Sequence, residues 1–115
     1  MADSATRKRY RRNRQDEIDS ATVYEAMAEA GTQPQLADVY RRLAMTERDH
    51  ADFWAEKLRE TGAEIPDMRP SWRARVLAWL ARRLGPDAVA STMRAGEATG
   101  GAGYTTQPEV EGTGM

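Results

Sequence analysis

The sequence predicts an all-α fold, in which an antiparallel helical hairpin is followed by one or two shorter helices. Apolar residues recur every three or four positions over two long stretches, which is the spacing of one helix face. Ala, Arg, Glu and Leu dominate the chain, and all four favour helices. No stretch alternates apolar and polar residues as a strand does. The chain has 115 residues, of which 40% are hydrophobic and 30% charged, so we expect one soluble domain with a modest core.

The N-terminal residues 1–8 are expected to be a disordered basic segment. Six positive charges lie within residues 7–14, where anionic lipid, nucleic acid or an acidic partner could meet them. A solvated helix end is the more common explanation. Positive charge at a helix N-terminus opposes the helix dipole, so this end should fray. We do not expect nucleic-acid binding, because no aromatic residues interleave the run and no reading motif accompanies it.

Residues 9–62 are predicted to form the helical hairpin. The first helix should run from about Arg9 to Ala30 and the second to about Thr61. Between them Gly31 suits a helix C-terminus and Pro34 the first turn of a new helix. A connection this short makes antiparallel neighbours. The inward stripe of the first helix is Tyr10, Glu17, Ala21, Tyr24 and Ala28, and that of the second is Leu36, Val39, Leu43, Trp54 and Leu58.

Glu47 and His50 form a Glu-x-x-His pair that interrupts the second apolar stripe. His50 is the only histidine, and residues three apart share a helix face. The motif alone is weak, because Glu is common in this chain and a satisfied core histidine is the usual explanation. Geometry strengthens it. Glu17 and Glu47 both lie roughly 21 Å from the turn at 1.5 Å per residue, so the two carboxylates and the imidazole should meet at one level.

Two acids and one imidazole at one level favour a metal site. The alternative is a buried polar layer that sets the helix register, and such a layer would need a Lys or Arg to neutralise the acids. The inward stripes offer none at this height, and we expect Arg14 and Arg48 to point elsewhere.

The chain has no cysteine, which excludes disulfides, thiolate zinc sites and iron–sulfur clusters. Carboxylate and imidazole ligands suit iron, with manganese as the other candidate.

Residues 63–70 are predicted to be a linker with prolines as breakers, and residues 71–104 an amphipathic helix and a partial second half. The helix Trp72–Leu84 has two interpretations. The favoured one packs it on the hairpin as a plain core helix, and the other lays its Trp/Leu face and its arginines on a membrane surface. Moderate helical character follows over residues 88–97. Glu97 and Tyr104 repeat the spacing of Glu17 and Tyr24, and residues 105–115 read as a flexible tail.

No segment approaches 18 consecutive apolar residues, so we expect no membrane span. The basic N-terminus is not followed by an apolar run, so it does not read as a signal peptide. A cytoplasmic location is the resulting expectation.

Beyond these ligands, three stretches carry a resemblance to a known family. They are residues 9–58, the segment Pro70-Ser-Trp-Arg-Ala-Arg, and Gln107-Pro-Glu. With the metal motifs they resemble the rubrerythrin-type branch of the ferritin-like superfamily. The resemblance is to the soluble domain of bacterial membrane-bound ferritins, which precedes a vacuolar-iron-transporter-type membrane portion. Such folds bind two metals through one Glu from each of two helices and a Glu-x-x-His from each of the other two.

The resemblance implies roles for individual residues. Glu17 would be the first-helix ligand, Glu47 the bridging carboxylate and His50 a terminal ligand, while Glu97 would be the third-helix ligand. Tyr24 and Tyr104 would orient carboxylates or carry electrons, which makes Tyr24 the candidate catalytic residue.

The departure from the family is the missing second Glu-x-x-His, which family members carry on a fourth helix. We expect a homodimer in which two hairpins complete a four-helix bundle around two iron ions. A monomer with a partial site and a truncated, inactive product are the other readings.

The implied function is iron binding with ferroxidase-type or peroxide-reducing chemistry, with ferrous iron and dioxygen or peroxide as substrates. The competing hypothesis is a metal-free or truncated helical interaction module. Such a module would dock on a partner or a membrane surface through its Trp/Arg helix.

Overall fold

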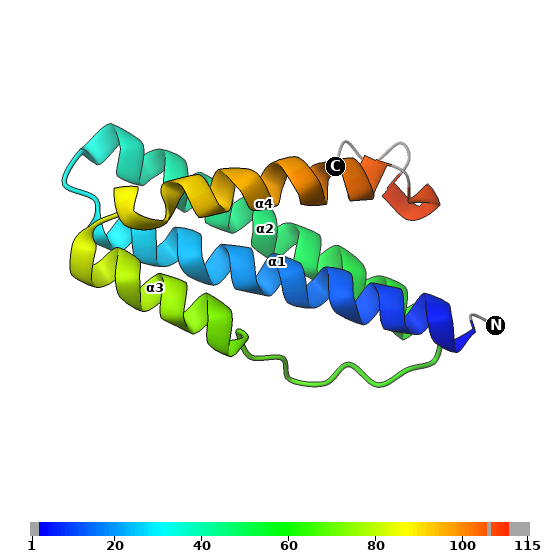
Figure 1. Cartoon of the computed structure of the whole chain (residues 1–115). Coiled ribbons are helices and arrows are strands. Elements are labelled where there is room, and N and C mark those ends of the chain that lie inside the picture. The colour runs from blue at the N-terminus through cyan, green and yellow to red at the C-terminus, as the bar shows by residue number, and fades with distance from the viewer. Residues whose placement is uncertain (1–2, 106, 111–115) are drawn as a thin grey trace.

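The computed structural model describes residues 3–105 and 107–110, with side chains for 3–96 and 107–110. Its elements are α1 (Ser4–Ala30), α2 (Pro34–Glu60), α3 (Trp72–Leu84), α4 (Asp87–Thr105) and the 3-10 turn η1 (Pro108–Val110). The first two helices form the long antiparallel hairpin; α3 lies along α1, and α4 runs back over the other side (Figure 1). The described residues contain no strand, so the all-α prediction is confirmed. None of the helices in that part of the chain has the length and apolar character needed to cross a bilayer.

The first helix begins earlier than the sequence suggested. We expected residues 1–8 to be disordered, but α1 starts at Ser4, so residues 4–8 are helical. Asp3 precedes the helix in an extended conformation, and its carboxylate accepts a hydrogen bond of 2.8 Å from the backbone N–H of Thr6. This cap satisfies one orphan donor and places a negative charge at the positive end of the helix dipole. It offsets the repulsion that the basic run was expected to exert.

The turn between the long helices is the predicted one. Pro34 occupies the first turn of α2, and Gly31 ends α1. A Cβ on Gly31 would lie 3.3 Å from the Cβ of Ala37 and 3.3 Å from the backbone oxygen of Met27. Glycine is therefore favoured here by the close approach of the two helices and not by its backbone angle, since a φ of −68° is open to any residue.

The face that α2 buries differs from the predicted stripe. Trp54 and Leu58 are fully buried as expected, but Val39 is 48% and Leu43 is 36% exposed. Small residues take their place against α1, namely Ala37, Ala44 and Ala51. Alanines let two helices approach closely, and this displaces the larger side chains to the flank.

The third helix has the predicted bounds, but its two tryptophans face solvent. Ala74, Ala78 and Ala81 form its buried face, whereas Trp72 and Trp79 are exposed. The favoured interpretation, in which this helix packs on the hairpin, is confirmed, but the tryptophans do not belong to the packed face. The helix packs on α1 through these alanines, with Leu77 and Leu80 partly buried against the same cluster.

The fourth helix is longer than the predicted 88–97. Its first turns bury Val89, Ala90 and Met93 in the cluster that joins α1 and α3. The side chains of Glu97 and Tyr104 lie outside the described residues, so the roles predicted for them stay predictions.

Residues 107–110, predicted as part of a flexible tail, form a strap against the N-terminal half of α1. Glu109 accepts two hydrogen bonds of 2.7 Å from the Arg9 guanidinium and one of 3.0 Å from the Tyr10 hydroxyl. The side-chain oxygen of Gln107 accepts from Arg9 at 2.6 Å and from Asn13 at 2.7 Å. Val110 is buried in the cluster of Tyr10, Trp54 and Leu58. For residues 107–110 the prediction of a flexible tail is wrong, because partners about a hundred positions away hold them.

The strap leads to a pH-dependent prediction. Arg9 and Tyr10 lower the pKa of Glu109 from 4.5 to about 2 against the opposing effect of burial. A lowered folded-state pKa stabilises the fold above the unfolded pKa, and that stability is lost as the pH falls from about 4.5 to about 2. Glu109→Gln is expected to lower the free energy of unfolding by about 1–2 kcal/mol at pH 7. Urea denaturation at pH 7 and pH 3 measures this.

The matched control is Glu64→Gln, which removes an exposed carboxylate in the linker. It should change the free energy of unfolding by less than about 0.5 kcal/mol at either pH. A Glu109→Gln deficit that is as large at pH 3 as at pH 7 would contradict the ion-pair explanation.

Candidate metal centre

Three potential ligands from the two long helices meet near the middle of the hairpin. Glu17 projects from α1, while Glu47 and His50 project from neighbouring turns of α2. Each offers one ligand atom, and these atoms all lie within 4.8 Å of one another. His50 Nδ1 is 3.2 Å from Glu17 Oε2. The equal heights calculated from the turn therefore correspond to a real meeting of the side chains.

The two carboxylates are buried and the imidazole lies at the edge of the core. Glu17 is 5% and Glu47 is 7% exposed, while the side chain of His50 is 22% exposed. Two carboxylates removed from water at such short range repel each other unless positive charge is shared between them. A cation at this point would supply that charge, and the exposed edge of His50 gives a route from solvent.

The arginines nearest along the chain are engaged elsewhere, as predicted. Arg14 donates a hydrogen bond of 2.8 Å to the backbone oxygen of Pro66. Arg48 forms an ion pair with Glu25 on the surface, with a 3.0 Å contact. Neither side chain acts as the counterion that a simple register-setting polar layer would need at Glu17 and Glu47.

The donor set fits a first-row divalent ion. Metal–oxygen and metal–nitrogen bonds of about 2.1 Å place opposite ligands about 4.2 Å apart, so small side-chain movements would bring all three donors onto one ion. Two carboxylates and an imidazole resemble the set that holds non-haem iron, and manganese accepts the same ligands. Glu17, Glu47 and His50 would hold the ion.

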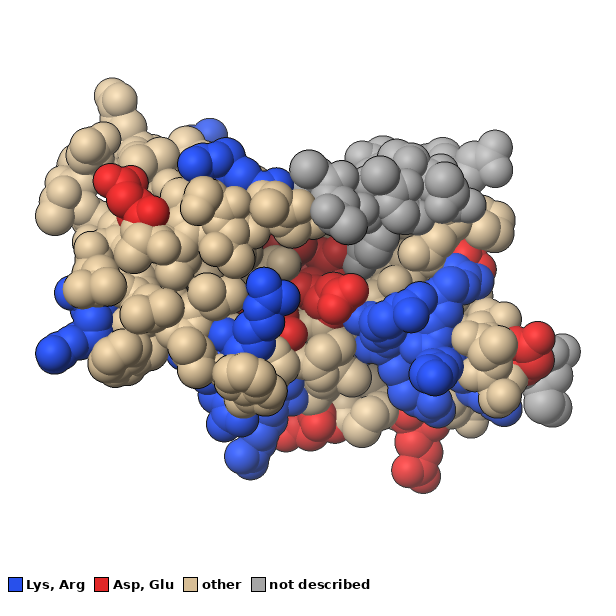
Figure 2. All heavy atoms as spheres, in the orientation of Figure 1, with Lys and Arg blue, Asp and Glu red and all other residues tan. Residues whose placement is uncertain are grey.

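The surroundings of the three ligands are acidic. Partial burial raises the pKa of Asp16, and the nearby carboxylates of Asp19 and Glu17 raise it further, against the opposing effect of Arg12. Figure 2 shows Asp and Glu side chains gathered in a hollow at mid-length of the bundle, with Lys and Arg on either side. A negative potential of this kind concentrates cations near the site. Asp16 was not predicted as part of the site, and only its position beside Glu17 could have indicated it.

Tyr24 lies two turns along α1 from Glu17 and is only 4% exposed. Its ring stacks on that of Tyr40 from α2, with centroids 6.3 Å apart and planes inclined by 15°. Tyr40 was not predicted as a neighbour of the site, although its position seven residues before Glu47 places it on the same helix face. The predicted electron-carrying or orienting role of Tyr24 stays a prediction.

Comparison with known proteins bears on this geometry. The family model described as Rubrerythrin matches residues 11–78, which is more than half of the chain. No curated protein matches, and no solved structure matches. The matched segment contains Glu17, Glu47 and His50, and it extends from α1 through the linker into α3. On the strength of that match, the chain belongs to the rubrerythrin family.

Proposed function

We propose that this protein is an iron-binding module of the ferritin-like type, in which Glu17, Glu47 and His50 hold ferrous iron. The observation that carries the proposal is the convergence of these three donors within 4.8 Å in the core of the hairpin. Membership of the rubrerythrin family supports the choice of iron. Manganese, with the same ligand preferences, is the competing ion.

A second copy of the chain completes the site in this proposal. One hairpin supplies one Glu and one Glu-x-x-His, and two hairpins related by a two-fold axis supply the full set for two ions. The exposed flank of α2 supports this arrangement, because Val39 and Leu43 lie on the same side of the helix as His50. Partner residues that covered this flank would bury the apolar side chains and the open edge of the imidazole together.

The chemistry proposed is oxidation of ferrous iron by dioxygen or peroxide, as in a ferroxidase. Bound iron supplies the redox change, and anionic carboxylate ligands favour its ferric state. The chain's own contribution is to hold two carboxylates and one imidazole in fixed positions away from bulk water. Tyr24 would orient a carboxylate or carry an electron, and Glu97 would be a further ligand.

Anaerobic titration with ferrous iron, followed by mass measurement in solution, tests the proposal. We expect about one tightly bound iron per chain and a dimer whose population rises with iron. Exposure to air should then produce the near-ultraviolet absorbance of ferric iron. A chain that stays monomeric and binds no iron would overturn the proposal, whereas a monomer that binds iron would overturn only the shared site. Parallel titration with Mn(II) separates the two candidate ions.

A further inference from the structure

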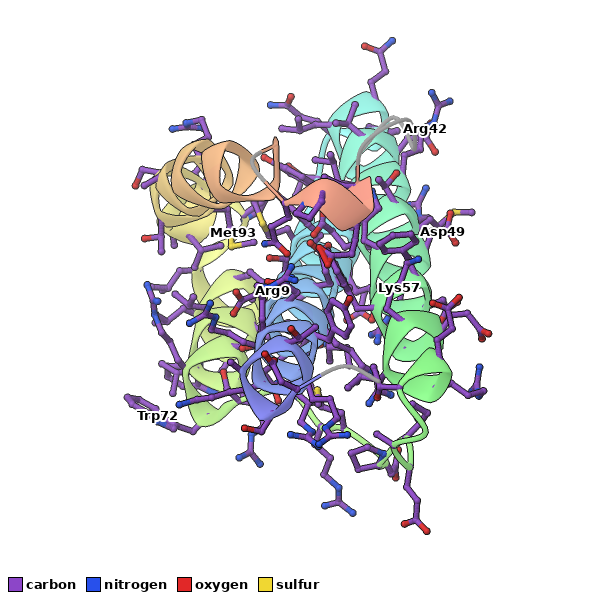
Figure 3. All side chains as sticks on the ribbon, turned by 90° about the vertical axis from the view of Figure 1, so that its right-hand side faces the viewer. Arg9, Arg42, Asp49, Lys57, Trp72 and Met93 are labelled. Carbon is purple, nitrogen blue, oxygen red and sulfur yellow. The ribbon has the colours of Figure 1, made fainter. Side chains whose placement is uncertain are left out.

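The outward face of α3 carries large apolar side chains with nothing packed over them among the described residues. Trp72 is 72%, Val76 is 46% and Trp79 is 58% exposed. They are spaced four and three residues apart, so they form one stripe along the helix. Trp72, labelled in Figure 3, points away from the bundle into solvent. Two tryptophans exposed on one helix stripe call for a partner surface.

The exposed stripe lies on the side of the helix opposite its buried face, so it is not the edge of the core. The alanines that α3 buries, Ala74, Ala78 and Ala81, lie on the side opposite Trp72 and Trp79. The helix therefore turns its alanines inward, with Leu77 and Leu80 partly buried beside them, and leaves both tryptophans outward. An ordinary core helix has the reverse arrangement.

Arginines flank the stripe, and α3 contains no acidic residue. The exposed arginines are Arg73, Arg75, Arg82 and Arg83. Arg83 lies over the ring of Trp79, with its guanidinium carbon 5.9 Å from the ring centroid. Arg82 is paired with Glu29 of α1 at 3.0 Å in an exposed contact. The outward face is therefore aromatic along its centre and basic along its edges.

We infer that α3 docks on the surface of an anionic lipid bilayer, a property that goes beyond the proposed iron site. Tryptophan rings favour the headgroup boundary, where the indole is partly buried and its N–H stays hydrated. Arginines beside them would pair with lipid phosphates and with the negative potential of the bilayer surface. A helix of this pattern lies in the plane of the interface and does not cross it.

Charge favours a bilayer over a second copy of the same face. Two α3 helices placed face to face would bring their arginine edges together and repel each other. A bilayer of anionic lipid offers negative charge to both edges at once.

The linker lies along the basic half of α1. Gln15 donates a hydrogen bond of 2.9 Å to the backbone oxygen of Arg69, and Arg14 binds Pro66. These contacts fix the linker against the basic half of α1. On the face where α1 and α3 lie, Figure 2 shows Lys and Arg side chains on either side of a central group of Asp and Glu side chains.

Co-sedimentation of the full chain with vesicles tests the inference. We expect binding to vesicles of phosphatidylcholine mixed with phosphatidylglycerol, weaker binding at high salt, and little binding to phosphatidylcholine alone. The double variant Trp72→Ala/Trp79→Ala should bind vesicles at least about tenfold more weakly than the unaltered chain. Arg75→Gln should weaken binding about fivefold.

The matched controls lie on α2, at the far corner of the bundle from Trp72, as the label of Arg42 in Figure 3 indicates. Arg42→Gln makes the same charge change, and Met45→Ala truncates a side chain that is 65% exposed. Both should bind as the unaltered chain does. Circular dichroism checks that every variant is equally helical.

Two results would overturn the inference. One is equal binding to neutral and anionic vesicles, or to neither. The other is a tryptophan double variant that keeps its affinity for vesicles but loses a dimer seen by mass measurement, which would assign the face to a second copy of the chain.

Discussion

Glu47→Gln is expected to weaken the binding of ferrous iron by about 100-fold or more. Glutamine keeps the shape of the side chain but removes the negative charge that a divalent ion needs in a site with little water. Mutation of residues that only orient a ligand lowers metal affinity about 10- to 100-fold. Loss of the charge on a ligand itself should therefore lower the affinity for iron by about 100-fold or more. Anaerobic titration in competition with a chelator of known affinity measures the change.

The same variant should change stability in opposite directions with and without iron. Without iron, Glu47 is one of two carboxylates buried side by side, and removing one charge relieves repulsion, so the variant should unfold no more easily than the unaltered chain. With iron in excess, the unaltered chain gains the stability that ligand binding confers, and the variant does not. Thermal unfolding with and without ferrous iron gives both comparisons.

Glu56→Gln is the control for this experiment, because it makes the same change at an exposed position on α2 that pairs with Arg59. It should bind iron as the unaltered chain does and show the same iron-dependent rise in unfolding temperature. If Glu47→Gln binds iron as tightly as Glu56→Gln, the three converging donors do not form a metal site.

The parts of the fold that depend on local sequence could be predicted. The turn at Gly31 and Pro34 was predictable because each residue has a distinct role at a helix end. The meeting of Glu17 with Glu47 followed from the fixed rise of a helix and the length of the connection. For α3, Ser71 caps the first turn and Gly85 follows the last, so its bounds were also readable from the chain.

The orientation of α3 could not be predicted, because periodicity shows that a helix has two faces but not which face is buried. The tryptophans of α3 and its alanines lie on opposite sides, and both sides are apolar. Hydrophobicity alone favours burying the tryptophans. Close packing against α1 favours the alanines, and this preference depends on the shape of the neighbouring helix.

The strap was missed for a different reason. Arg9 and Glu109 are a hundred positions apart, and no local pattern pairs them. The sequence around Glu109 is rich in glycine and short of apolar residues, which is typical of a flexible tail. Its order comes from long-range hydrogen bonds to α1 and from one buried side chain, Val110. Neither contribution can be predicted from the local sequence, because both depend on contacts with the folded helix α1.

Trp54→Ala is expected to lower the free energy of unfolding by about 3–5 kcal/mol, the usual loss when a fully buried tryptophan is truncated. Trp54 has 0% exposure. Its ring centroid lies 5.6 Å from that of Tyr10 on α1 and 4.9 Å from that of Phe53, against which it packs edge-on. Val110 of the strap packs in the same cluster, so one side chain joins α1, α2 and the C-terminal segment. Urea denaturation followed by circular dichroism measures the loss.

Trp79→Ala removes the same side chain from an exposed site on α3 and is the matched control, with an expected change within about 0.5 kcal/mol. The double variant Trp54→Ala/Glu109→Gln should lose less than the sum of the two single losses, because the cavity at Trp54 already loosens the strap that Glu109 holds. His50 lies one turn before Trp54, so the cavity should also weaken iron binding. A loss at Trp54 no larger than that at Trp79 would mean that the hairpin does not pack around this residue, and the position of His50 beside Glu17 would lose its structural support.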